Sequence, residues 1–353
     1  MDDDELEWEV IKQAQDIMCA KQQTATTSNS SMDVVLHQQI PLGLRNNAEN
    51  VCFGNVVIQA LYALPEFRAK VENCVFTSSS CGKALQRLFN KISTSTRKVS
   101  DPVTTSTYFH QMGINGYEIG RQYDSHEFLT FLLDEVYQEI TDNCMFRVDI
   151  LDTVICEKRL DDGHICGNEV SPPINSSIAL TLNVDTTCIQ SISDMLQKMM
   201  MIPEVLSEYK CDECSTVGQC YKTTTVTHLS DALLIQFSLF RYTNRRSIKL
   251  KPRIIIDDEI SFYGSSMTLH SVIYHSGQSA NTGHYTCTVK VNNQWFSIND
   301  NHVREINEQS VFNNRDSSVF DNRDVVPYIV IYKKIIALSM CLALAIEWVR
   351  ARN

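Results

Sequence analysis

The chain has 353 residues, of which 43% are hydrophobic and 21% are charged, and its formal net charge is −11. This composition is typical of a soluble globular protein with one large or two ordinary domains, and it excludes a disordered chain. The acidic balance argues against a nucleic acid partner, because phosphates are bound by basic surfaces. The 13 cysteines are odd in number, and the acidic start MDDDELEWEV contains no apolar leader, so a reducing cytoplasmic or nuclear compartment is expected.

The predicted elements change from helices to strands along the chain. Residues 1–39 contain a short acidic helix followed by a polar linker. Apolar residues recur at helical spacing over 51–136, whereas 151–225 holds short strands and loops rich in Cys, Thr and Ser. Residues 232–332 are strand-rich, with Gly or Asn-Asn turns between the strands. The apolar run in 335–353 is too short to span a bilayer alone, so we expect a helix that packs on the protein or a partner, with a membrane tail as the lesser alternative.

Cys52 stands where a polar, turn-prone stretch meets a predicted helix. Phe53, Val57 and Leu61 recur at helical spacing and mark one apolar face of that helix. A helix start carries partial positive charge, which lowers the pKa of a thiol and favours the nucleophilic thiolate. The sequence therefore indicates a candidate nucleophile, and a packed core thiol is the alternative.

A catalytic cysteine also needs a histidine base and a group that orients the histidine. In SANTGHYTCTVKVNNQWFSIND (279–300), His284 opens one strand, an Asn-Asn turn reverses the chain, and a second strand ends at Asn299 and Asp300. Antiparallel pairing of these strands would bring Asn299 back beside His284. The spacing thus predicts a base and its orienting group.

Four segments together resemble the ubiquitin-specific proteases. GLRNNAENVCFGNVVIQALY (43–62) is similar to the cysteine box of that family, and GRQYDSHEFLTFLLDEV (120–136) is similar to its glutamine-aspartate box. HSVIYHSGQSANTGHYTCTVKVNNQWFSINDNHV (270–303) resembles its histidine box, and VPYIVIYKK (326–334) resembles its closing strand. The order and spacing of the four segments also agree with the family.

The resemblance implies an α+β, papain-like cysteine protease fold over residues 40–334. A helical thumb is expected at about 40–140, fingers at about 145–225 and a palm at about 226–334. The implied activity is that of a cysteine-type deubiquitinase, which hydrolyses the isopeptide or peptide bond after the C-terminal Gly-Gly of ubiquitin. Ubiquitin and ubiquitinated proteins are the expected partners, and an activating protein is a candidate further partner.

The resemblance also implies roles for individual residues. Cys52 is the expected nucleophile, His284 the general base and Asn299 the third member of the triad, with Asp300 as a supporting acid. Asn47, five residues before the cysteine, is the expected oxyanion donor together with the Cys52 N–H. The residues expected to bind substrate or shape its channel are Gln122, Asp124, Gly283 and Tyr285.

Departures from the family pattern cluster before the nucleophile. The family's usual Gly-Asn-Thr-Cys is here Glu49-Asn50-Val51-Cys52, and a carboxylate at Glu49 is expected to raise the thiol pKa and oppose an oxyanion. One extra residue in this segment makes Asn46 compete with Asn47 for the donor role. Two alternatives follow: a ubiquitin-binding pseudoenzyme with the same fold, and a papain-like thiol hydrolase with another substrate.

Two cysteine pairs predict a metal site. The first, in KCDEC, has the spacing that lets two sulfurs reach one zinc. The resemblance implies a second pair upstream, and CEKRLDDGHICGN (156–168) supplies it with an insertion between the cysteines. The four expected ligands of a structural Zn²⁺ are Cys156, Cys166, Cys211 and Cys214. His164 is a candidate substitute ligand, Cys220 is not expected to be a ligand, and no cofactor is expected for catalysis.

Overall fold

The computed structural model describes residues 40–47, 49–77, 80–95, 103–113, 117–118, 120–140, 143–243, 246–279, 282–312 and 325–335. The predicted acidic helix and linker lie outside the described residues, as does the apolar tail beyond Ile335. The chain divides into two compact units, residues 1–41 and 42–353. The second unit, described below, contains the predicted site. Among the described residues, no helix combines the length and apolar character needed to cross a membrane.

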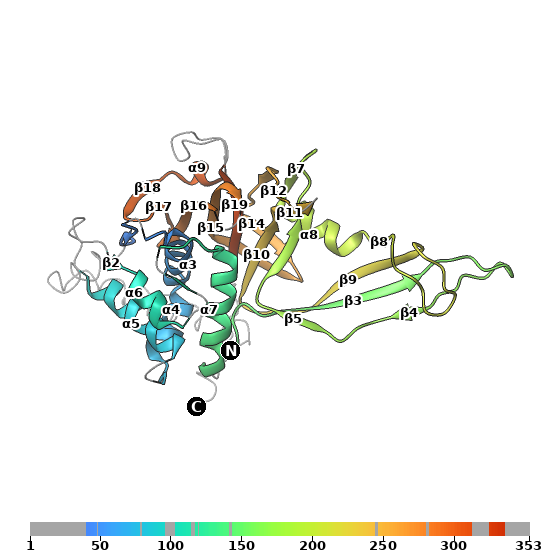
Figure 1. Cartoon of the computed structure of the whole chain (residues 1–353), viewed down its shortest axis with the longest axis horizontal. Coiled ribbons are helices and arrows are strands. Elements are labelled where there is room, and N and C mark those ends of the chain that lie inside the picture. The colour runs from blue at the N-terminus through green and yellow to red at the C-terminus, as the bar shows by residue number, and fades with distance from the viewer. Residues whose placement is uncertain are drawn as a thin grey trace, which may run out of the picture. The chain divides into compact units, whose positions relative to one another are not determined.

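Helices form the first part of this unit, as the apolar periodicity predicted (Figure 1). They are α3 (Cys52–Tyr62), α4 (Pro65–Asn73), α5 (Cys81–Thr94), α6 (Ser106–Gln111) and α7 (Ser125–Glu139). Two short parallel strands, β1 (Leu44–Arg45) and β2 (Val103–Thr104), pair beside them. Helix α3 is buried along almost its whole length, and Phe53 packs against the rings of Phe109 and Phe128. These aromatic contacts join α3 to α6 and α7.

A large mixed sheet forms the second part. Its strand order is β18-β17-β16-β15-β19-β10-β6, with β14 also paired to β15. The strands are β6 (Leu180–Asn183), β10 (Ala232–Ser238), β14 (Glu259–Phe262), β15 (Ser265–Ser279), β16 (Thr282–Val291), β17 (Gln294–Asn299), β18 (His302–Ile306) and β19 (Val325–Lys334). Helix α3 packs on β16 and β15, so the sheet and the helices share one apolar core.

Smaller elements flank the large sheet. β7 (Ile189–Ser191) pairs in parallel with β13 (Arg253–Ile255), and β11 (Phe240–Thr243) pairs with β12 (Arg246–Lys249). Helix α8 (Ile192–Met201) begins with a capping box formed by Ser191 and Asp194. The short helix α9 (Glu308–Phe312) packs near β17.

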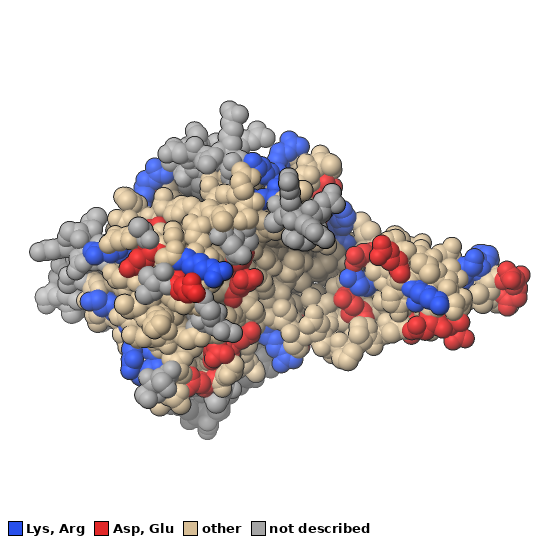
Figure 2. Space-filling model, in the orientation of Figure 1, with Lys and Arg blue, Asp and Glu red and all other residues tan. Residues whose placement is uncertain are grey.

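A second sheet, the finger sheet, extends away from the helices and the large sheet (Figure 1). Its long strands β3 (Val148–Cys156) and β9 (Cys220–Leu229) are antiparallel, and three short strands complete it: β4 (Glu169–Val170), β5 (Asn175–Ser177) and β8 (Glu204–Leu206). A separate small core of cysteines lies at its far end. On the face shown in Figure 2, acidic and basic side chains are interspersed along this sheet, and Lys222 pairs with Glu204 at 2.7 Å.

Candidate active site and metal centre

Cys52 is the first residue of α3, and its side chain is 3% exposed. The backbone N–H of Tyr285, at the start of β16, donates to the Cys52 sulfur, as does the N–H of Phe53. Burial, with a smaller contribution from the Asp300 carboxylate, nevertheless raises the pKa of the Cys52 thiol to about 11. The unliganded protein therefore holds this cysteine mainly as a neutral thiol at neutral pH.

His284 and Asn299 meet as the strand pairing predicted. β16 and β17 are antiparallel, with Cys287 opposite Ile298. His284 Nε2 lies 2.7 Å from Asn299 Oδ1. A carbonyl oxygen accepts a hydrogen bond, so Nε2 carries the proton of the neutral ring and Nδ1 is left as the basic nitrogen. Because Tyr285 follows His284 and its N–H reaches the thiol, the Cys52 sulfur lies beside the backbone of β16 next to His284.

Asp300 connects three segments of the site. It is 9% exposed, and its φ of 50° lies in the left-handed region. Asp300 Oδ2 accepts from Asn46 Nδ2 at 2.8 Å, and Oδ1 accepts from Asn55 Nδ2 at 2.9 Å. Thr105 Oγ1 in turn donates to Asn55 Oδ1 at 2.6 Å. The carboxylate thus holds the loop before Cys52 and helix α3 against the end of β17.

The two asparagines that compete for the oxyanion role differ in their surroundings. Besides its bond to Asp300, Asn46 accepts from the Val51 N–H at 3.0 Å, so both ends of its amide are used inside the protein. Asn47 is exposed to solvent. Of the two amides, that of Asn47 is the one open to a ligand.

Glu49 does not face Cys52 as the sequence suggested. Its Oε2 is buried without a hydrogen-bond partner. Burial and the Glu49 charge together raise the pKa of Tyr117 to about 12, so the Glu49 charge acts on that phenol. The carboxylate that raises the Cys52 pKa is Asp300.

Gln122 holds Gly283 with two hydrogen bonds. Gln122 Nε2 donates to Gly283 O, and the Gly283 N–H donates to Gln122 Oε1, both at 3.0 Å. Gly283 has φ of 137°, and a Cβ there would lie 2.1 Å from Ser276 O, so glycine is required. This pair fixes the backbone that precedes His284.

Asp124 and Tyr285 are buried. Asp124 caps α7 by accepting from the N–H groups of His126 and Glu127, and its Oδ2 accepts from Tyr328 Oη at 2.7 Å. Burial raises the pKa of Tyr285 well above its usual range. Both side chains therefore form part of the wall behind the site.

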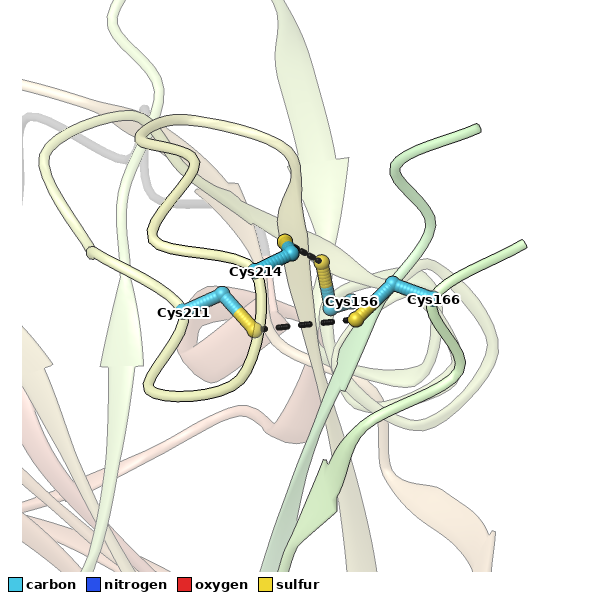
Figure 3. Close-up of side chains that lie close together, drawn as sticks. All are labelled: Cys156, Cys166, Cys211 and Cys214. Atoms are coloured by element: carbon cyan, nitrogen blue, oxygen red, sulfur yellow. Dashed lines mark hydrogen bonds between the residues drawn. The ribbon is translucent and has the colours of Figure 1, made fainter. Parts of the chain in front are cut away.

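The four predicted metal ligands converge at the end of the finger sheet (Figure 3). All four sulfurs lie within 4.8 Å of one another. The Cys156 and Cys214 sulfurs are 3.7 Å apart, and those of Cys166 and Cys211 are 3.9 Å apart. Four sulfurs arranged tetrahedrally around zinc at about 2.3 Å would lie about 3.8 Å apart, so the residues fit the ion.

Local hydrogen bonds prepare two of these thiols for metal binding. Bonds from Thr216 lower the pKa of Cys214 to about 6, and the Cys214 N–H lowers the pKa of Cys211. A thiolate is the form that binds a metal ion. His164, the alternative ligand, is exposed and pairs with Asp162 outside this group.

Two residues that support the site were not predicted from the sequence. Asn55, on α3, holds Asp300, and Thr105, just before α6, holds Asn55 in turn. The available signal was a polar residue, Asn55, on an otherwise apolar helix, because a buried amide requires partners.

A cysteine at a helix start, with a histidine and an asparagine on adjacent strands of a sheet packed on that helix, defines a papain-like cysteine hydrolase. The sequence model of the family described as ubiquitin carboxyl-terminal hydrolase matches residues 42–332, and the chain belongs to this family. It is a cysteine-type deubiquitinase with the predicted α+β fold of thumb, palm and fingers.

Named relatives and solved structures agree with this assignment. Ubiquitin carboxyl-terminal hydrolase 12 of Salmo salar is 24% identical over 304 residues, which cover 74% of this chain and 80% of that protein. Ubiquitin carboxyl-terminal hydrolase 4 of Arabidopsis thaliana is 25% identical over 331 residues, or 79% and 90% of the two chains. The SAGA DUB module bound to monoubiquitin contains a chain with a TM-score of 0.65 and 20% identity, and the match covers 85% of this chain and 70% of that chain.

Proposed function

We propose that Cys52, His284 and Asn299 form the catalytic triad that cleaves the bond after the C-terminal Gly-Gly of ubiquitin. The observation that carries this proposal is the 2.7 Å contact between His284 Nε2 and Asn299 Oδ1, together with a Cys52 sulfur that accepts from the N–H of Tyr285, the residue after His284. The contact leaves Nδ1 of His284 free to act as a base. Nucleophile, base and orienting group are then supplied by one helix start and two neighbouring strands.

Activation of Cys52 requires proton transfer. His284 Nδ1 accepts the thiol proton, and Asn299 Oδ1 stabilises the imidazolium through its Nε2–H without adding charge. The N–H groups of Tyr285 and Phe53 stabilise the sulfur anion that results. The thiolate attacks the terminal glycine carbonyl, His284 then protonates the departing amine, and water hydrolyses the thioester.

Asn47 and the Cys52 N–H are the proposed oxyanion donors. Asn47, five residues before the nucleophile, is exposed, whereas Asn46 already bonds to Asp300 and to the Val51 N–H. Asn46, Asn55 and Asp300 act on the reaction by positioning the loop that carries the donor. Gln122 positions His284 through Gly283.

Substrate recognition is assigned to the wall of the site and to the finger sheet. Asp124 and Tyr285 act through the shape of that wall, because both are buried. The similar SAGA DUB modules are bound to monoubiquitin and to ubiquitin aldehyde. We extend ubiquitin binding to this chain, with the finger sheet holding the globular body of ubiquitin.

Zinc is the proposed ion of the four-cysteine cluster. The sulfur separations of 3.7 and 3.9 Å support it. Bound Zn²⁺ would supply a structural cross-link between the end of β3 and the turn before β9, with no part in catalysis. Retention of four zinc-binding thiols favours a reducing cytoplasmic or nuclear location.

A ubiquitin that carries a C-terminal electrophile tests the proposed nucleophile. We expect a covalent adduct at Cys52, identified by peptide mass spectrometry, and no adduct with Cys52→Ala. A second candidate, a protein that binds ubiquitin without turnover, is favoured by the raised pKa of the buried Cys52. Tight binding of the probe without an adduct would establish that candidate, and absence of binding would contradict both.

A further inference from the structure

Cys220 lies directly across the finger sheet from the metal ligand Cys156. The two residues are partners in the antiparallel pairing of β3 and β9. Each is 1% exposed, and together with Cys211 they form the small buried core at the end of this sheet. A fifth thiol is therefore packed against the four proposed zinc ligands.

The backbone bonds show how close Cys156 and Cys220 are. The Cys156 N–H donates to Asn168 O at 2.9 Å, and Cys156 O accepts from the Gly167 N–H at 3.0 Å, both on the side away from β9. The neighbouring Glu157 N–H donates to Gln219 O at 2.9 Å. Cys156 and Cys220 are thus a non-hydrogen-bonded pair, in which Cα atoms are about 4.5 Å apart and side chains project from the same face. That spacing lies within the range of about 4.4–6.8 Å that disulfides span.

We propose that Cys220 is the oxidation partner of Cys156, and that hydrogen peroxide converts the two thiols into a disulfide across β3 and β9. The inference rests on the zinc site proposed above. One sulfur attacks the peroxide, so that an S–O bond forms, the O–O bond breaks and water leaves. The other sulfur then attacks the resulting sulfenic acid, forming the S–S bond and releasing a second water. Two thiols are oxidised and one peroxide is reduced to two waters.

The fold favours this pair over other thiol pairs in the cluster. The unbroken register of β3 with β9, from Ile150 to Cys156, holds Cys156 opposite Cys220 without help from a metal. Cys211 and Cys214 lie in the turn before β9, and Cys166 follows the loop closed by the Arg159–Ile165 bridge. Once Cys156 is in a disulfide, only three thiolates of the site remain, and zinc is released because its four-coordinate shell is incomplete.

Peroxide treatment of the zinc-loaded full chain tests the proposal. Released zinc is measured with a metallochromic indicator, free thiols are capped with N-ethylmaleimide, and the protein is digested with trypsin without reduction. Cys156 is then alone on peptide 148–158, whereas Cys211, Cys214 and Cys220 share peptide 211–222. We expect these peptides to be joined, with fragmentation placing the bond at Cys220, and one zinc released per disulfide. Dithiothreitol should restore zinc binding.

Matched variants separate the fifth thiol from the ligands. Cys220→Ala should retain zinc but release it several-fold more slowly under peroxide, while the exposed Cys188→Ala should match the unmodified chain. The proposal is overturned if Cys156 is joined to Cys214 while Cys220 carries N-ethylmaleimide, or if Cys220→Ala loses zinc at the unmodified rate. If Cys220→Ala fails to fold, the peptide map of the unmodified chain decides whether Cys156 is joined to Cys220 or to Cys214. If the purified protein contains no zinc, the assignment of the metal site is wrong. The same peptide map then still tests whether Cys156 and Cys220 form a disulfide.

Discussion

The large sheet and the finger sheet both contain long antiparallel strands, but different interactions stabilise them. β15 and β19 are buried along most of their length in a core that they share with α3. β3 and β9 are half exposed along most of theirs, and the second core among the described residues consists of cysteines. Because a narrow ribbon buries little apolar surface, it is marginally stable alone. The catalytic geometry therefore depends on packing and polar bonds, whereas the loops at the end of the finger sheet depend on the proposed metal.

Removal of the nucleophile should separate activity from stability in the helix and sheet region. Cys52→Ala should lower kcat by about 10⁶, the scale seen when a protease loses its nucleophile. The melting temperature should change little, because the change removes one atom at a helix start. Hydrolysis of a fluorogenic ubiquitin conjugate and a thermal melt measure the two effects. Unchanged hydrolysis would remove Cys52 from the mechanism.

Loss of a metal ligand should have the opposite pattern. Cys211→Ser should lose most of one zinc per chain, measured by elemental analysis, and should lower the melting temperature because the end of the finger sheet loses its cross-link. Cys188→Ser, at an exposed cysteine, is the matched control. Full zinc content in Cys211→Ser would show that the four cysteines do not form the site.

The two neighbouring asparagines should separate chemistry from positioning. Asn47→Ala should lower kcat by about 10²–10³, the cost of one oxyanion donor, with ubiquitin binding retained. Asn46→Ala should lower the free energy of unfolding by about 1–3 kcal/mol, because it leaves Asp300 and the Val51 N–H without this partner. Steady-state kinetics and denaturant unfolding of both variants provide the comparison. Equal effects on stability would reject the division of roles.

The raised pKa of Cys52 predicts a pH dependence for its alkylation. Only the thiolate reacts, and below a pKa of about 11 its fraction rises about tenfold per pH unit. The rate at which iodoacetamide alkylates Cys52 in the free enzyme should therefore rise steadily between about pH 7 and pH 10. A rate that is already level near neutral pH would show that His284 holds the thiolate as an ion pair in the free enzyme.

Replacement of Glu49 should give the smallest effect. Glu49→Gln removes a charge whose Oε2 is buried without a partner, so stability should rise by about 1 kcal/mol or less. Because the Glu49 charge acts on Tyr117 and not on Cys52, hydrolysis should rise only modestly. A large gain in kcat would show that Glu49 does act on the nucleophile.

Features that depend on one short segment could be predicted from the sequence. The position of Asn299 beside His284 follows from a single hairpin, and Cys211 and Cys214 follow from their spacing. Cys156 and Cys166 lack that spacing and were predicted from the family resemblance. The network around Asp300 could not be predicted in full, because Asn46, Asn55 and Thr105 come from three separate segments. The sequence also could not decide whether Asn46 or Asn47 is the oxyanion donor, because Asn46 is occupied by a bond to Asp300 from a distant segment. The pairing of Cys220 with Cys156 likewise requires the register of two strands that are distant in the chain.

The place of β19 in the large sheet has a consequence for synthesis. β19 is the last of the described strands, yet it pairs between β15 and β10 in the middle of the sheet. During translation β15 and β10 therefore each lack one neighbour until residues 325–334 leave the ribosome. A nascent chain that stops before this point has an incomplete sheet and exposed strand edges, a form prone to aggregation. The large sheet on which α3 packs is thus complete only after nearly all of the catalytic domain has been made.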